Sequence, residues 1–526
     1  MDRRAFLAAG AAAGAVGCAT NGAAPGRPRE LALEEVSLTE ISDGLSRGRW
    51  NSSQLVEFYT KRASEIDSGG PMLRSILELN PDAGKEAWRL DEERKQGRVR
   101  GRLHGVPILI KDNIDTAGSM MTTAGSLALV GWRAPADATM VRQLRQAGAL
   151  ILGKTNLSEW ANFRSPRSTS GWSGRGGQTR NPHVLDRNPS GSSSGSAVAV
   201  AASLCAAAIG TETDGSIVSP ASANGIVGIK PTVGLVSRVG IIPISRSQDT
   251  AGPMARCVLD AAILLDAITG VDARDTATSA QQGQGVGHYA EVLDATALRG
   301  AKLGLVRTFV HNHPAVDRVL TECVRVLKDK GATVLEVKLE NSAKLGEAEF
   351  EVMLYEFKAG LEAYLAQLPA GKPHTLAELI EFNRRNAAVE MPWFAQETLE
   401  QAARKGTLSE SAYIEARRTC LRISRTEGID AVMAQHALNA IVGITESPAF
   451  PTDWVNGDHF SGGSSTWAAV AGYPHITVPA GMVQSLPVGL SLFGKAWSER
   501  ALISLAGAFE HATEARRKPR FLARAV

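Results

Sequence analysis

The chain has 526 residues, of which 44% are hydrophobic and 21% are charged, and its formal net charge is +3. This composition is typical of a globular protein that has enough apolar residues for a substantial core. Because the basic residues form no stripe and only 5% of the residues are aromatic, the sequence gives no support to nucleic-acid binding.

The amino terminus has the pattern of an export signal. Arg3 and Arg4 precede an Ala/Gly-rich apolar stretch that runs to Cys18 and is too short to span a bilayer stably. Paired arginines before such a stretch point to the twin-arginine route. We therefore predict that residues 1–30 are an export signal and tether, and that the protein is periplasmic or anchored on the outer side of the membrane. Cys18 is a candidate for lipid attachment.

The rest of the chain reads as one domain. No Pro/Ser/Gly linker and no long run of charge divides residues 31–526, which favours a single large domain with an inserted helical region. Four further cysteines are widely spaced in apolar segments, so we expect buried thiols rather than a disulfide framework. They are Cys205, Cys257, Cys323 and Cys420.

Strand and helix signals alternate after residue 100. The apolar run 106–110 predicts a buried strand that ends at Lys111. Residues 137–147 have helical apolar spacing, and 149–152 then read as a strand. This alternation predicts an α/β fold with a central mixed sheet covered by helices. Similar signals occur at 302–306, 316–328, 333–337, 438–442 and 475–479.

From about residue 345 to 430 the pattern is mostly helical. Apolar residues repeat there every three to four positions, which predicts helices with one buried face. Such an insertion either forms a packed accessory layer or covers a substrate site, and both interpretations stay open. The repeating residues are Leu354, Phe357, Leu361 and Leu365.

Two serine-containing loops carry the strongest functional signal. The loop Pro189–Ser196 contains Ser192, and the loop Gly210–Ser216 ends at Ser216. The small apolar residues 197–208 between them predict a buried helix that runs into a strand. A serine hydroxyl is a weak nucleophile until a base takes its proton, and a lysine whose pKa is lowered by burial can be that base. Lys111, at the end of an apolar strand, is the candidate.

These loops, together with residues 225–238, resemble the amidase signature family. The interval of 24 positions between Ser192 and Ser216 is the interval expected between the two serines of that family. The resemblance implies the amidase signature fold, with its core at about residues 100–260. It also implies that Lys111 is the base, that Ser192 is the relay and follows a cis peptide bond, and that Ser216 is the nucleophile. Neither a cofactor nor a metal is expected.

The second loop also predicts an oxyanion hole. Gly215 frees the turn next to Ser216, so the backbone N–H groups of Thr213, Asp214, Gly215 and Ser216 could converge on the oxyanion of a tetrahedral intermediate. Asp214 stands where the family commonly has glycine. Its carboxylate either shapes the pocket and contacts the substrate, or stabilises the turn locally.

A closer likeness is to bacterial peptide amidases, which hydrolyse the C-terminal amides of peptides to the free acid and ammonia. It is carried by residues 211–216, 247–254, 354–361 and 471–474. The likeness implies a monomeric serine amidohydrolase that acts on peptide or other small-molecule amides through an acyl-enzyme.

Four alternatives stay open. The chain could hydrolyse other small, aryl or fatty amides instead. The amide-hydrolysing subunit of a glutamyl-tRNA amidotransferase would share Lys111, Ser192 and Ser216, but it would need partner subunits and ATP in the cytoplasm. A binding protein would not need the three residues together. The run Gly191–Gly195 also fits a nucleophile elbow with Ser193 as nucleophile, which requires a late histidine. Candidates are His436, His459, His475 and His511.

Overall fold

The computed structural model describes residues 33–310 and 313–525. From Glu34 onward the chain folds as one compact unit. The predicted export signal of residues 1–30, with Arg3, Arg4 and Cys18, lies outside the described residues.

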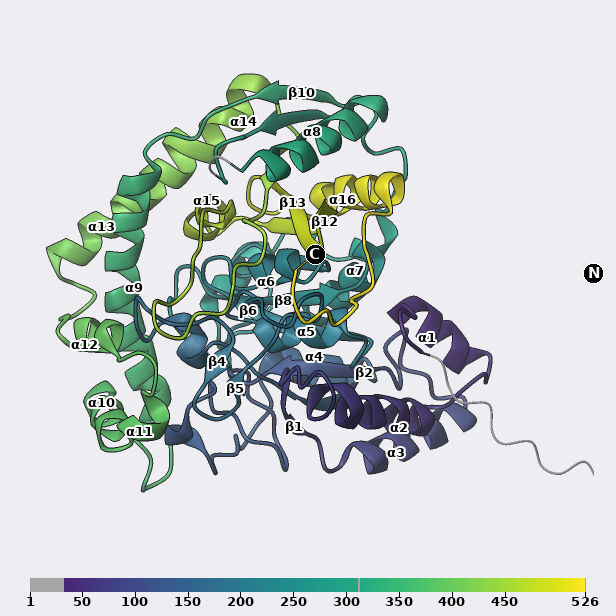
Figure 1. The fold of residues 1–526 in the computed structure, drawn as a ribbon, viewed down its shortest axis with the longest axis vertical. Helices are drawn as coiled ribbons and strands as arrows, with labels where there is room; N and C mark the ends of the chain where they lie inside the picture. The colour runs from purple at the N-terminus through teal and green to yellow at the C-terminus, as the bar shows by residue number, and fades with distance from the viewer. Residues whose placement is uncertain (1–32, 311–312, 526) are drawn as a thin grey trace, which may run out of the picture. The chain divides into compact units, whose positions relative to one another are not determined.

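The centre of the fold is a mixed sheet of eleven strands in the order β1-β3-β2-β6-β8-β7-β12-β13-β11-β9-β10, and β4 and β5 form a separate ribbon (Figure 1). The strands are β1 (Ile76–Leu79), β2 (Pro107–Lys111), β3 (Leu150–Thr155), β4 (Trp172–Ser173), β5 (Gly177–Gln178), β6 (Ala207–Glu212), β7 (Val227–Lys230), β8 (Thr250–Ala255), β9 (Lys302–Leu305), β10 (Thr333–Glu336), β11 (Ala440–Ile444), β12 (His475–Val483) and β13 (Leu486–Phe493).

Sixteen α-helices occur in the described part of the chain. They are α1 (Leu38–Ser46), α2 (Ser52–Arg62), α3 (Ala83–Lys95), α4 (Thr139–Gln146), α5 (Ser194–Ala201), α6 (Val218–Ala223), α7 (Val258–Ile268), α8 (Pro314–Asp329), α9 (Ser342–Leu365), α10 (Leu376–Arg385), α11 (Ala387–Glu390), α12 (Glu397–Ala403), α13 (Ser411–Leu421), α14 (Asp430–His436), α15 (Ser465–Ala471) and α16 (Glu499–Thr513).

The sheet combines parallel and antiparallel pairs. β2 runs parallel to both of its neighbours, β3 and β6, whereas β8 is antiparallel to β6 and β7. Helices α5, α7 and α16 pack against the sheet. β2 and β6 are buried along their whole length, because helices and loops cover both of their faces. The predicted α/β class with a central mixed sheet is confirmed.

Local signals explain where the predicted elements begin and end. α8 starts at Pro314, two residues before the predicted start, because the His313 side chain accepts a hydrogen bond from the Val316 N–H and proline suits the first turn. β12 continues to Val483, beyond the predicted end, because it pairs with β13 in an antiparallel hairpin.

The inserted helical region runs from α9 to α14 and lies along the left side of the view in Figure 1. The apolar stripe of α9 is buried, as its spacing predicted. Leu361 and Leu365 have no exposed surface, and they share a hydrophobic cluster with Trp160 and Ile242 of the sheet domain. The region is therefore a packed layer at this contact.

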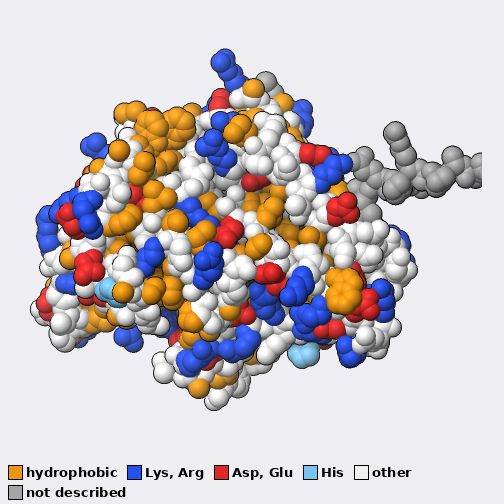
Figure 2. Space-filling model, turned by 90° about the horizontal axis from the view of Figure 1, so that it is seen from below, with side chains coloured by type: hydrophobic (Ala, Val, Ile, Leu, Met, Phe, Trp, Pro, Cys, Tyr) orange, Lys and Arg blue, Asp and Glu red, His pale blue; other side chains and the backbone are white. Residues whose placement is uncertain are grey.

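The remaining surface features agree with the composition. Cys205, Cys323 and Cys420 are buried, Cys257 is partly buried, and all four are free thiols. None of the helices in the described part of the chain is both long and apolar enough to cross a bilayer. On the face shown in Figure 2, Lys and Arg side chains lie among Asp and Glu side chains, with hydrophobic side chains between them.

Candidate active site

Lys111 occupies the last position of β2 and is completely buried. Its Nζ atom donates hydrogen bonds to Ser192 Oγ at 2.8 Å and to Ser193 Oγ at 3.0 Å. It also donates to Thr211, at 2.9 Å to Oγ1 and 3.2 Å to the carbonyl oxygen. The strand thus delivers one amine to a shell of hydroxyl and carbonyl oxygens.

The electrostatic setting of Lys111 favours the neutral amine. Burial lowers the pKa of Lys111 to about 7, although the nearby carboxylates Glu212 and Asp249 act in the opposite direction. At neutral pH, a large fraction of this amine is therefore uncharged and able to accept a proton.

The loop before α5 holds Ser192 in contact with the amine. The Gly191–Ser192 peptide bond is cis, as the family resemblance implied. Ser192 is fully buried, and its carbonyl oxygen accepts from the Ser158 N–H at 3.1 Å. The N–H of Ser193 donates to the carbonyl of Ser216 at 3.0 Å, which joins the two serine loops through their backbones.

The turn between β6 and α6 holds Ser216. Its neighbour Gly215 has a φ of +77°, and a Cβ atom there would lie 2.9 Å from Ser219 Oγ and 3.0 Å from Ser465 Oγ. Both the conformation and the space therefore require glycine at this position. The buried Glu212 carboxylate fixes the far side of the turn, because it accepts from the backbone N–H groups of residues 217 and 218 at 2.8 and 3.0 Å.

The same turn leaves backbone donors free. Among the described residues, the N–H groups of Thr213, Asp214, Gly215 and Ser216 donate to no other backbone or side-chain group. Free N–H groups next to a hydroxyl are what an oxyanion hole needs. This arrangement is consistent with the predicted role of the loop.

The structure brings the three predicted residues into one cluster. Lys111 contacts Ser192 directly, and Ser216 is linked to the serine loop through the backbone. Within the described contacts, the hydroxyls of Ser192 and Ser216 are not hydrogen-bonded to each other. Catalytic hydrogen bonds are often loose without substrate, and rotation of the Ser216 side chain can complete the relay.

The nucleophile-elbow alternative gains no partner in the structure. His459 pairs with Asp453 at 3.1 Å and His475 with Ser491 at 2.6 Å. Among the described contacts, neither these histidines nor His436 and His511 hydrogen-bond Ser193. Its hydroxyl instead contacts Lys111 and the Thr211 carbonyl.

Several residues of the site were not predicted from the sequence. Asn113 donates to Thr211 Oγ1 at 3.0 Å, and Thr213 Oγ1 donates to Asp249 at 2.6 Å. Asn113 stands two positions after Lys111, and Thr211 precedes Ser216 in the same loop, so their proximity was visible in the sequence. Asp249 comes from a distant segment, and only the fold places it here.

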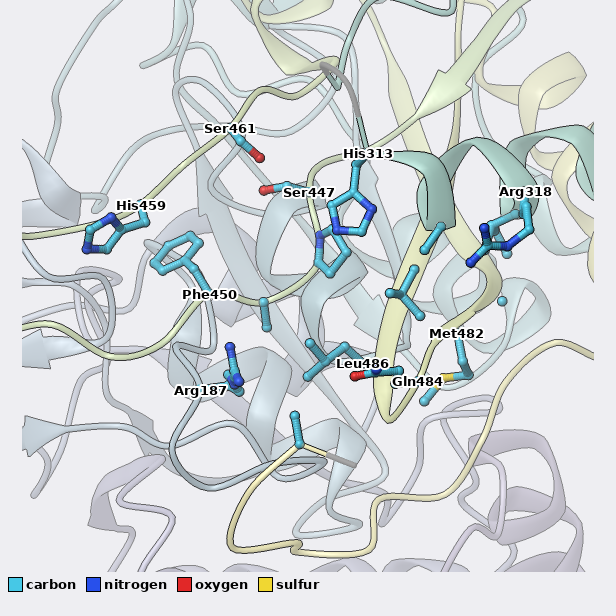
Figure 3. Close-up of a pocket in the computed structure, with 18 of the residues that line it drawn as sticks. Arg187, His313, Arg318, Ser447, Phe450, His459, Ser461, Met482, Gln484 and Leu486 are labelled. Atoms are coloured by element: carbon cyan, nitrogen blue, oxygen red, sulfur yellow. The ribbon is translucent and has the colours of Figure 1, made fainter.

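A pocket of about 700 Å³ lies near this cluster (Figure 3). The candidate catalytic residues do not line it, but two chain segments connect it to them. Ser447 lines the pocket, and the preceding Glu446 accepts a hydrogen bond from Ser190 Oγ at 3.2 Å. Ser461 also lines the pocket, and Ser465 lies against the turn that bears Ser216. Other lining residues are Arg187, His313, Arg318, Phe450, His459, Met482 and Leu486.

No group of three or more His, Cys, Asp or Glu side chains that could hold a metal ion occurs in the described part of the chain. The nearest sequence signal was the pair His311 and His313. His311 is outside the described residues, and His313 caps α8.

The fold and the family match together define this protein as a hydrolase that acts on amide C–N bonds. The family model Amidase matches residues 54–503, and the chain belongs to this family. The resemblance predicted from the serine loops is confirmed.

Known proteins resemble the chain over nearly its whole length. The X-ray structure of a peptide amidase from Stenotrophomonas maltophilia is 51% identical, with a TM-score of 0.90, over 93% of this chain and 99% of that one. A probable amidase of Arabidopsis thaliana is 40% identical over 94% of this chain and 93% of its own. One subunit of the glutamyl-tRNA(Gln) amidotransferase of Acinetobacter baumannii is 32% identical, over 92% and 97%.

Proposed function

We propose that the protein is a serine amidohydrolase that removes the amide group from peptide C-termini, with Lys111 as base, Ser192 as relay and Ser216 as nucleophile. The observation that carries the proposal is the 2.8 Å hydrogen bond from the buried Lys111 amine to Ser192, beside the turn that bears Ser216. We further expect the enzyme to act as a monomer, which sedimentation velocity would test.

The proposed reaction proceeds in two halves. Neutral Lys111 takes a proton from Ser192, which takes one from Ser216, and the Ser216 oxygen attacks the amide carbon. The free N–H groups of residues 213–216 stabilise the oxyanion. The proton returns through Ser192 to the leaving nitrogen, so ammonia departs and an acyl-enzyme remains. Water then attacks the acyl-enzyme with the same groups acting in the same order, which releases the acid.

The choice of a peptide amide rests on the likeness to peptide amidases and on the pocket beside the site. A pocket of this size with both charged and apolar walls suits the peptide on the acyl side of the reacting carbon. A closed space beyond the leaving nitrogen would admit NH2 but not a continuing chain. The amidotransferase alternative is disfavoured by the export pattern at Arg3 and Arg4, because that reaction belongs to the cytoplasm.

We expect peptide amides to be converted to free acids with a gain of about one mass unit, from replacing NH2 by OH on the acyl group. Mass spectrometry would follow this change, and an ammonia assay would confirm the leaving group. The matched control is the same peptide with an N-methylated terminal amide, which we expect to react far more slowly. Internal cleavage, or activity only on fatty amides, would contradict the substrate assignment while leaving the catalytic residues open to their own test.

We also propose export by the twin-arginine route. Replacing Arg3 and Arg4 together by lysine should leave the precursor in the cytoplasm, because this route depends on the arginine pair rather than on charge alone. Cell fractionation would measure the distribution. Undiminished export of the double variant would contradict the proposal, and a Cys18→Ala variant would separately report on lipid attachment.

A further inference from the structure

We propose that Asp214 and Glu349 share one proton, and that the resulting hydrogen bond positions the turn that bears Ser216. The inference rests on the proposed function, because it assigns a positioning role within that site. It also gives helix α9 of the inserted region a direct part in holding the catalytic loop.

The first observation is a buried carboxylate oxygen without a conventional donor. Asp214 lies inside the oxyanion turn, and its Oδ2 atom accepts from Thr466 Oγ1 at 2.7 Å. Its Oδ1 atom is buried and receives no N–H or O–H from amide, hydroxyl or basic groups of the described chain. A buried acceptor of this kind is costly unless something donates to it.

The second observation is the group that faces this oxygen. Glu349 projects from α9, is only 4% exposed, and hydrogen-bonds to Asp214. Two carboxylates only accept hydrogen bonds, so this contact requires that one of the two groups is protonated. The shared proton therefore supplies the donor that Oδ1 lacks.

Gln248 fixes which oxygen of Glu349 carries the proton. Its Nε2 atom donates to Glu349 Oε1 at 2.7 Å and to the Thr213 carbonyl at 3.4 Å. An oxygen that accepts from an amide is not itself the donor, so the proton belongs on Oε2, toward Asp214. Gln248 thus links α9 to the turn a second time, one residue before Asp214.

The surrounding charges favour a single negative charge on the pair. Lys230 is the cation that acts on Asp214, while Glu212 adds a second negative charge on that side. On the side of α9, Glu349 shares its surroundings with Cys420, Glu356 and Arg417, and Asp249 binds the adjacent Thr213. Burial raises the pKa of both carboxyl groups, and that of Glu349 lies well above its usual range.

A pH limit on catalysis follows. When alkali removes the shared proton, two adjacent carboxylates repel each other, and the turn loses its attachment to α9. Activity should therefore fall on the alkaline side as well as on the acid side, where Lys111 becomes protonated. The two limbs have separate chemical origins and can be separated by mutation.

The test compares kcat and KM from about pH 6 to about pH 10, a range that brackets the ordinary titration of histidine and lysine. We expect Glu349→Gln to keep a neutral donor toward Asp214, to retain measurable activity at neutral pH, and to lose the alkaline limb. Glu349→Leu removes the donor and should lower kcat by about 10- to 100-fold with little change in KM, as for a small misplacement of the reacting group. Circular dichroism would check that each variant is folded.

Glu356→Gln is the matched control, because Glu356 is another buried carboxylate of α9 but binds Ser245 and Ser247 instead of the turn. This variant should keep the alkaline limb. A wild-type profile without an alkaline limb, or an unchanged limb in Glu349→Gln, would overturn the inference. The rate of Ser216 labelling by a fluorophosphonate, measured over the same pH range, gives the profile whatever amide is the substrate. If Ser216 is not labelled at all, the proposed function fails instead.

Discussion

Replacing Ser216 by alanine should abolish the acyl-enzyme and lower kcat by about four orders of magnitude or more, as expected when a nucleophile is removed from a group of residues that act together. Lys111→Ala and Ser192→Ala should be similarly severe, because the proton has no other path to or from the Ser216 oxygen. Steady-state rates on a peptide amide, together with intact-protein mass after fluorophosphonate treatment, would measure both effects.

Ser193 supplies the control for this prediction. Its hydroxyl also contacts Lys111, so the two serines of the cis-peptide loop differ in proposed role but not in environment. Peptide mapping of the labelled wild-type enzyme should place the adduct on Ser216. An adduct on Ser193, or near-normal turnover by the Ser216 variant, would reject the proposed nucleophile and favour the elbow interpretation.

The acid limb of the activity profile should follow Lys111. Burial lowers the pKa of Lys111 to about 7, and only the neutral amine accepts a proton. Activity should therefore rise as pH rises through about 7, and about one tenth of the amine remains neutral one pH unit below this value. Initial rates at saturating and at low substrate concentrations would give the profiles of kcat and of kcat/KM.

A histidine with an ordinary pKa could produce a similar limb, so mutation must distinguish the two. Lys111→Arg keeps the positive charge at every accessible pH and should be inactive throughout the range. His475→Asn and His459→Asn should leave the limb in place. Loss of the limb in either histidine variant, with activity retained in Lys111→Arg, would contradict the lysine base.

The parts of the site that could be predicted from the sequence are those that lie close together along the chain. Lys111 ends an apolar strand, and Ser192 and Ser216 each stand in a small-residue loop, so local patterns were sufficient. Glu349 and Asp249 reach the turn that bears Ser216 from far along the sequence. Their contacts depend on how α9 packs on the sheet domain, and no local pattern contains that information.

The fold shows the same division. β2 and β3 were predicted because continuous apolar runs are typical of buried parallel strands. β8 (Thr250–Ala255) contains glycine and proline and shows no alternation, although it is completely buried. β13 was also not predicted. Its residues are buried on both faces, so the period of two that identifies a half-exposed hairpin strand is absent.

The position of the site in the sheet affects how the enzyme loses activity. Lys111 ends β2, and the turn that bears Ser216 follows β6, the parallel neighbour of β2. Both strands lie inside the sheet rather than at its edge. Regions of this kind open only when most of a domain unfolds, whereas loops and termini open locally at little cost. The lysine and the turn that bears Ser216 are therefore as rigid as the core, and fraying at the sheet edges or chain ends leaves their spacing unchanged.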